Sequence, residues 1–251
     1  NAISTHRLTA YLKNTWKTQI DCTQIFLIGG ARAQYWDFNK QLLFSPRISV
    51  AIKPNWKKDW LFRLSGGSYY QPPFYKEIFN QSGVKNKNIK AQESYHIVTG
   101  ADYNFTAWRR PFKFVAEAYY KKLENLIPYT VDNLRIIYEG KNKAHGYVTG
   151  VDLKITGEFV KGVDSWLSIS LMQTKEDIKN DSYVTENNQG ESQTVYPGYI
   201  PRPTDQAITV NLFFQDYYPG DPTWKMHLNL VYGSGLPFGP PNSPRYTATG
   251  R

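Results

Sequence analysis

The sequence predicts an all-β fold, namely a portion of an antiparallel transmembrane β-barrel, and three observations lead to this prediction. Apolar residues recur at every second position from Ile208 to Phe214 and from Met226 to Tyr232, as in strands that are apolar on one face only. The connections between such segments alternate between short turns and long polar loops. Aromatic residues make up 16% of the chain, and barrels gather them in girdles at the two membrane interfaces.

Each predicted strand is a run with this alternation, bounded by turn residues. Most runs reach the roughly 9–11 residues that a tilted membrane strand requires. We expect about ten strands. They are Arg7–Trp16, Ile20–Tyr35, Leu42–Lys53, Trp60–Tyr70, Lys90–Phe105, Phe112–Leu123, Ala144–Phe159, Trp166–Lys175, Thr204–Asp216 and Trp224–Gly233.

The predicted connections fall into a short and a long set. The short ones hold turn residues such as Pro-Asn and Pro-Gly, and in bacterial barrels they face the periplasm, whereas the long loops face outside. The connection Trp36–Gln41 is short but falls in the long set, which is the one poor fit. The short set is Lys17–Gln19, Pro54–Asp59, Thr106–Pro111, Val160–Ser165 and Tyr217–Thr223; the long set is Gln71–Ile89, Glu124–Lys143, Ile178–Pro203 and the residues from Ser234 onward.

The alternation also assigns two faces. Ile48, Val50 and Ile52 should face lipid, and Arg47 and Ser49 should face the interior, where charged residues fall repeatedly. A soluble β-sandwich alternates in the same way, but strand length, aromatic content and the asymmetry of the connections favour the barrel. The candidates that should face the lumen or a plug domain are Arg63, His96, Asp102, Glu117, Asp152 and His227.

Composition excludes several classes of protein. No apolar run approaches the roughly 20 residues of a membrane helix. The net charge is +9, but the basic residues are scattered and form no stripe, which argues against nucleic acid as a partner and leaves anionic solutes or lipopolysaccharide. The single Cys22 forms no internal disulfide, and the first residues carry no signal peptide, so we expect a mature or truncated piece.

Several segments resemble the barrel of TonB-dependent outer-membrane receptors. The resemblance spans essentially the whole chain, and it is specific only as a combination of segments. These include Phe44-Ser45-Pro46-Arg47, Gln71-Pro72-Pro73, Ala116-Glu117-Ala118-Tyr119-Tyr120-Lys121, Leu126-Ile127-Pro128-Tyr129, Ala144-His145-Gly146-Tyr147, Arg202-Pro203-Thr204-Asp205-Gln206 and Gly235-Leu236-Pro237-Phe238-Gly239-Pro240-Pro241.

The resemblance implies a barrel of about 22 strands plugged by an N-terminal domain. It further implies active import of a scarce solute by a Gram-negative bacterium, driven by proton-motive force through TonB. Residues 1–251 would then be the C-terminal part of the barrel, without the plug, the early strands and the closing strands. The implied partners are the TonB complex, the plug, outer-membrane lipid and lipopolysaccharide, a small-molecule, glycan or peptide cargo, and a surface lipoprotein in part of the family.

Aromatic and Arg side chains in the long loops are the candidates for contact with cargo, because these residue types dominate recognition surfaces. The alternative for each of these side chains is a structural role, either in packing between loops or in the interfacial aromatic girdle. The family pattern also suggests a short helix in the loop after Gln71. The loop candidates are Phe74, Tyr75, Arg135, Tyr138, Tyr183, Tyr196 and Tyr199.

The sequence offers little support for catalysis. Ser168 and Ser170 face the interior, but no Gly-x-Ser-x-Gly elbow surrounds them, so we expect no enzyme. No histidine lies at metal-ligand spacing to another histidine or to Cys22, so we expect no metal or cofactor. A passive outer-membrane channel and a surface-binding or adhesive barrel are the alternatives to an importer.

Overall fold

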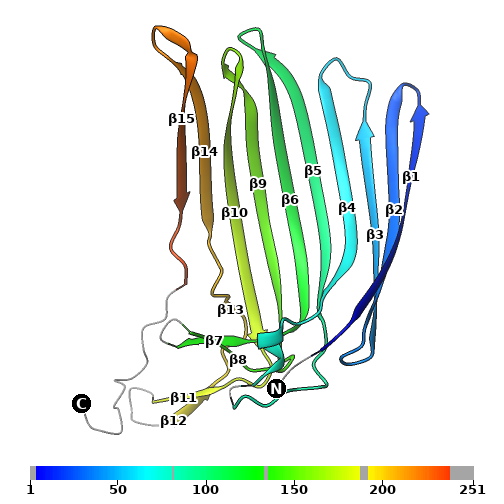
Figure 1. The fold of residues 1–251 in the computed structure, drawn as a ribbon, viewed down its shortest axis with the longest axis vertical. Helices are drawn as coiled ribbons and strands as arrows, with labels where there is room; N and C mark the ends of the chain where they lie inside the picture. The colour runs from blue at the N-terminus through cyan, green and yellow to red at the C-terminus, as the bar shows by residue number, and fades with distance from the viewer. Residues whose placement is uncertain (1–3, 81, 133–134, 187–191, 238–251) are drawn as a thin grey trace.

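The computed structural model is all-β, and it describes residues 4–80, 82–132, 135–186 and 192–237. Its main element is an 11-stranded antiparallel sheet (Figure 1). Ten long strands form a continuous path in this sheet, and each corresponds to one predicted strand. In order along the path they are β1 (Arg7–Ile20), β2 (Thr23–Trp36), β3 (Gln41–Lys53), β4 (Asp59–Gln71), β5 (Gln92–Ala107), β6 (Arg110–Leu126), β9 (Ala144–Val160), β10 (Val163–Ile178), β14 (Ile208–Tyr218) and β15 (Asp221–Gly233).

The path begins at β1 and ends at β15, so the described strands form an open, curved sheet with two edges (Figure 1). Each strand pairs with the one before and after it on the path, which gives a meander. The described residues contain no helix that is both long and apolar enough to cross a membrane.

All five short connections lie at one end of the sheet, as the sequence predicts (Figure 1). The fourth and fifth turns, at Lys161-Gly162 and Pro219-Gly220, are shorter than predicted, and the first and third also differ. The first turn is at Asp21 and Cys22 and not at Lys17–Gln19, and the third contains only Trp108 and Arg109. All four residues have positive φ, between 44° and 66°, as in the two-residue turns whose twist matches that of paired strands.

The long connections lie at the opposite end, together with the N-terminal residues (Figure 1). The short helix suggested for the first of them is present as the 3₁₀ turn η1 (Tyr75–Ile78). The second and third long loops contain short strands that the sequence did not predict, because two to four residues are too few to show an alternation. These strands are β7 (Tyr129–Asp132) paired with β8 (Arg135–Tyr138), β11 (Tyr183–Glu186) paired with β12 (Ser192–Val195), and β13 (Ile200–Pro201) paired with β10.

A compact layer covers this end, which we call the loop cap: the β2–β3 turn together with the described residues of the segments 72–91 and 127–143. Its core is the fully buried Trp36 packed with Ile78, Ile89 and Ile127. Amide side chains join the segments. Asn39 Nδ2 donates to the carbonyl of Ile89 at 2.7 Å, and Asn142 both accepts from the Lys90 N–H at 2.7 Å and donates to the Lys90 carbonyl at 3.0 Å. The loop cap is therefore a packed layer and not a set of independent loops.

Candidate functional site

The cross-strand register divides the sheet into two chemically different faces. In an antiparallel pair, directly opposed residues lie on the same face. Arg63 is opposite Gly100, which is opposite Glu117, which is opposite Asp152, and this row defines what we call the polar face. Leu64, Thr99, Ala118 and Val151 form the next row, on what we call the apolar face.

The six residues predicted to face the interior all lie on the polar face. On β5, Asp102 and His96 lie an even number of residues from Gly100 and therefore on the same face. On β15, His227 is opposite Gln215 of β14, which also lies on the polar face. The alternation in the sequence therefore grouped these residues correctly. That the polar face lines a lumen or meets a plug stays a prediction.

Four of the polar-face side chains form an ion-pair cluster near the short turns. Asp102 lies at its centre, with one oxygen 2.7 Å from Arg63 Nη2 and the other 2.7 Å from Lys113 Nζ. Arg63 Nη2 also lies 2.9 Å from a carboxylate oxygen of Glu117. Only 9% of the Asp102 side chain is exposed, so its charge depends on these two cations. The charged groups of the cluster neutralise one another, so little net charge remains to bind a ligand.

Replacing Asp102 by asparagine is expected to destabilise the fold by about 1–3 kcal/mol, because it leaves Arg63 and Lys113 without their shared acceptor. Unfolding in urea measures this. The matched control is Asp152→Asn, which should be neutral, because Asp152 has no basic group within 4.0 Å among the described residues and lies opposite Glu117. Equal losses from both substitutions would remove the cluster's assigned role.

The loop candidates do not converge on one site. Phe74 and Tyr75 are exposed and line a cleft of about 290 Å³ with Thr5 and Arg7. Arg135 and Tyr138 line a different cleft of about 640 Å³ together with Lys76, Phe79, Asn80, Ile136 and Ile137. Both clefts belong to the loop cap or its margin. Tyr138 also packs against the core around Trp36, which matches the alternative of loop packing.

The three remaining tyrosines lie elsewhere. Tyr183 and Tyr196 are exposed in and beside the β11–β12 hairpin. Tyr199 packs against Tyr147 and His145 at ring distances of 5.5 and 5.6 Å, and both partners belong to the apolar face. The contacts of Tyr199 therefore favour the girdle alternative over a role in binding cargo.

The sequence analysis did not identify Tyr69, which contacts two other side chains in the half of the polar face nearer the long loops. The Arg47 guanidinium lies 4.5 Å above the Tyr69 ring, and His96, on the neighbouring strand β5 and opposite Gly67, stacks on the same ring at 4.3 Å. Arg47 was predicted to face the interior, but only the register shows that these three side chains form one stack.

Within the loop cap, burial raises the pKa of Glu77 above its ordinary 4.5, although hydrogen bonds from the Phe74 N–H and from Gln92 oppose the shift. Burial, with the nearby charge of Glu77, likewise raises the pKa of Tyr138. A raised carboxyl pKa means that the folded cap prefers the protonated form. The cap should therefore become more stable as the pH falls through the folded pKa towards 4.5, and it should lose this gain as the pH rises again.

Replacing Glu77 by glutamine should remove that pH dependence and leave the cap as stable at pH 7 as at pH 5, because glutamine can still accept from the Phe74 N–H. Amide hydrogen exchange of the segment 74–86 at both pH values measures this. Wild-type protection that does not rise on acidification would contradict the assignment.

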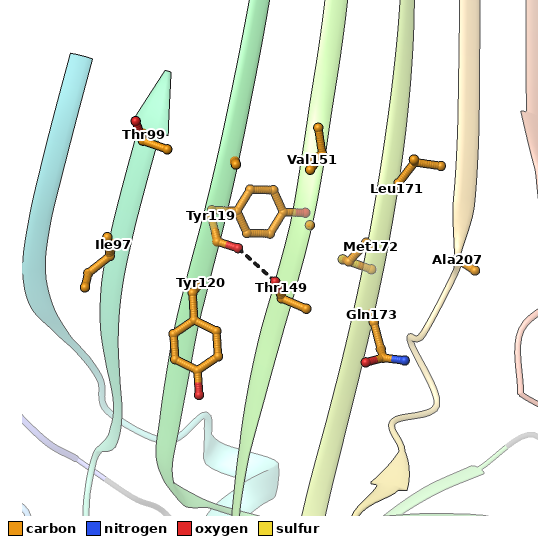
Figure 2. Close-up of a pocket in the computed structure, with 12 residues that line it drawn as sticks. Ile97, Thr99, Tyr119, Tyr120, Thr149, Val151, Leu171, Met172, Gln173 and Ala207 are labelled. Carbon is orange, nitrogen blue, oxygen red and sulfur yellow. Dashed lines mark hydrogen bonds between the residues drawn. The ribbon is translucent and has the colours of Figure 1, made fainter. Parts of the chain in front are cut away.

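The apolar face also carries a shallow depression of about 660 Å³ (Figure 2). Ile97, Ala118, Val151 and Leu171 line it, and Thr149 Oγ1 donates to the Tyr119 carbonyl at 3.3 Å. Its lining contains no charged side chain, and it lies on the face that exposes large apolar side chains. We do not regard it as the functional site.

The described residues contain no group of three or more His, Cys, Asp or Glu side chains that could hold a metal ion. Comparison with known proteins found no matching family model and no matching curated protein.

Proposed function

We propose that this chain forms part of the wall of an outer-membrane β-barrel that imports a scarce solute with energy supplied through TonB. The observation that carries the membrane assignment is the apolar face. Large apolar side chains are exposed across it, for example Ile48, Leu64, Ile97 and Leu228, each at least 55% accessible. An exposed apolar surface of this extent requires a partner, and a lipid bilayer is the partner that suits every strand at once.

Two aromatic belts border this surface. Near the short turns, Trp60 stacks on Tyr103 at 4.4 Å, Tyr103 on Phe105 at 5.2 Å, and Phe105 on Phe112 at 5.6 Å. Towards the long loops, Tyr120 lies 6.3 Å from Tyr147. Girdles of this kind mark the two interfaces of a membrane barrel.

The space between the belts matches a bilayer. On β6 the apolar face carries no charge from Phe112 to Tyr120, and on β9 none from Tyr147 to Ile155. About eight residues at about 3.4 Å each, tilted by about 40°, span about 21 Å, close to the roughly 25 Å band of membrane barrels.

The transport assignment rests on the resemblance to TonB-dependent receptors and on the polar face opposite the band, which would line the lumen. Substrate would enter past the loop cap and meet that face. The plug and the TonB-binding segment would be supplied by sequence outside these residues.

The test is binding of the complete gene product, in detergent, to the periplasmic domain of TonB. Saturable binding that disappears when the N-terminal segment is deleted would support an energised importer. No binding under any ligand condition would remove that function and leave a passive channel or an adhesive barrel.

A further inference from the structure

The polar face of β1–β4 is charged differently from the rest of the sheet. From Arg7 to Gln71 the only acidic residues are Asp21, Asp37 and Asp59, all in turns or at a strand end. On β5, β6 and β9, by contrast, Asp102, Glu117 and Asp152 share the polar face with the cations. All lysines and arginines within β1–β4 lie on the polar face, and they are Arg7, Lys13, Lys17, Arg32, Arg47, Lys53 and Arg63.

The register places two of these cations in one row with a glycine between them. Lys13 is opposite Gly30, Gly30 is opposite Arg47, Arg47 is opposite Gly67, and Gly67 is opposite His96. A Cβ atom at Gly67 would lie 3.0 Å from Arg47 Cγ and 2.7 Å from the Pro46 carbonyl. Gly67 therefore leaves space beside the Arg47 side chain that any other residue would occupy, and Gly30 does the same beside Lys13, whose Cβ would lie 3.8 Å from a Cβ at Gly30.

The stack beneath Arg47 fixes its orientation. The guanidinium rests on Tyr69, Tyr69 rests on His96, and a 2.6 Å hydrogen bond joins His96 Nε2 to Ser94 Oγ. A cation–π contact restrains a guanidinium without using its N–H groups as hydrogen-bond donors, so they stay free for a bidentate acceptor. Among the described residues, no carboxylate lies within 4.0 Å of Lys13, Arg32 or Arg47.

Two adjoining recesses open onto these side chains and share Arg32, Arg47 and Tyr69. One, of about 760 Å³, adds Tyr11 and Lys13, and the other, of about 400 Å³, adds amide and hydroxyl groups. Both volumes lie in the range of small-molecule sites. The amide and hydroxyl groups are those of Gln34, Gln71, Gln92, Ser45 and Ser94. Glu93, whose carboxylate accepts a hydrogen bond from the Tyr70 hydroxyl, and Arg202, which pairs with Glu176, also line this second recess.

From this arrangement we propose that Lys13, Arg32 and Arg47 bind the carboxylate or phosphate group of the transported solute. This inference rests on the proposed function and adds the chemical class of the cargo. Charged edges that are already oriented lose little freedom on binding, and the nearby amides and hydroxyls suit the other polar atoms of a compact anion. An acidic segment of a plug domain would use the same charges, and the experiment distinguishes the two.

The experiment uses the complete gene product in detergent at low ionic strength. Titration calorimetry measures binding of succinate and inorganic phosphate, with succinamide as the uncharged probe. The test variant is R32Q/R47Q. The matched control is K154Q/K225Q, which removes two positive charges from the polar face of β9 and β15. TonB binding is measured on every sample.

Wild-type protein should bind at least one of the two anions saturably and should not bind succinamide. The affinity should fall by at least about tenfold in R32Q/R47Q, because the variant removes the charge-assisted hydrogen bonds of both guanidinium groups, and it should be nearly unchanged in K154Q/K225Q. No anion binding, or equal losses in both variants, would overturn the proposal, and so would unchanged affinity with faster proteolysis of the plug in R32Q/R47Q. Failure of wild-type TonB binding would instead overturn the importer and leave the anion site standing.

Discussion

Replacing Trp36 by alanine is expected to destabilise the loop cap by about 3–5 kcal/mol, because the substitution leaves a cavity at the centre of its core. Trp36 is fully buried, stacks on Phe38 at 5.1 Å and packs with Ile78, Ile89 and Ile127. The long strands should remain paired, since most of their contacts are with one another. Hydrogen exchange should therefore show faster exchange in the segments 72–91 and 127–143 and little change in β5, β6 and β9.

The control for this prediction is Trp224→Ala, at the opposite end of the sheet. Trp224 is 69% exposed, so its loss should cost less than about 1 kcal/mol. If Trp36→Ala loosened the strands as much as the loop segments, the loop cap would not be a separate packed layer.

Replacing Leu153 by arginine is expected to cost about 2–4 kcal/mol of stability in a bilayer, because it places a charge at the middle of the apolar face. Leu153 lies opposite Ala116 on β6 and Ile169 on β10, far from either aromatic belt. The measurement is reversible folding of the complete gene product into lipid vesicles, followed by urea titration.

The same charge added on the polar face provides the comparison. Ser170→Arg lies on the neighbouring strand, opposite Asp152, and should cost little or stabilise the fold slightly. Equal tolerance of Leu153→Arg and Ser170→Arg would show that the two faces meet similar surroundings, which contradicts a bilayer on one side only.

The existence and order of the ten long strands could be predicted from sequence, because a period of two is a strong signal over about ten residues. The turns could not be placed as well. Asp21-Cys22 and Trp108-Arg109 are not recognised turn pairs, and they adopt positive φ because the paired strands on either side demand it. The polar run Lys17–Gln19 looked like a turn, but its residues continue the ladder with β2.

The candidate site shows the same limit. The alternation of polar and apolar residues along each strand was enough to place Arg63, Asp102 and Glu117 on one face. This assignment requires no knowledge of which strands are neighbours in the sheet. The Arg63–Asp102–Lys113 cluster and the Arg47–Tyr69–His96 stack depend on cross-strand register, which the sequence does not specify. The loop candidates do not converge on one site for a related reason. Packing around Trp36 determines the position of Tyr138, and no local sequence pattern near Tyr138 indicates that packing.

The most direct test of the membrane assignment is the accessibility of nitroxide labels on the complete gene product in lipid vesicles. Single cysteines replace Leu153, Ile169, Asp152 and Ser168 in turn, in a Cys22→Ser background because Cys22 is exposed in the first turn. Labels at 153 and 169 should collide readily with oxygen and be shielded from a water-soluble nickel chelate, and labels at 152 and 168 should show the reverse. Equal access of the chelate to all four positions would contradict a bilayer against the apolar face, and with it the outer-membrane barrel.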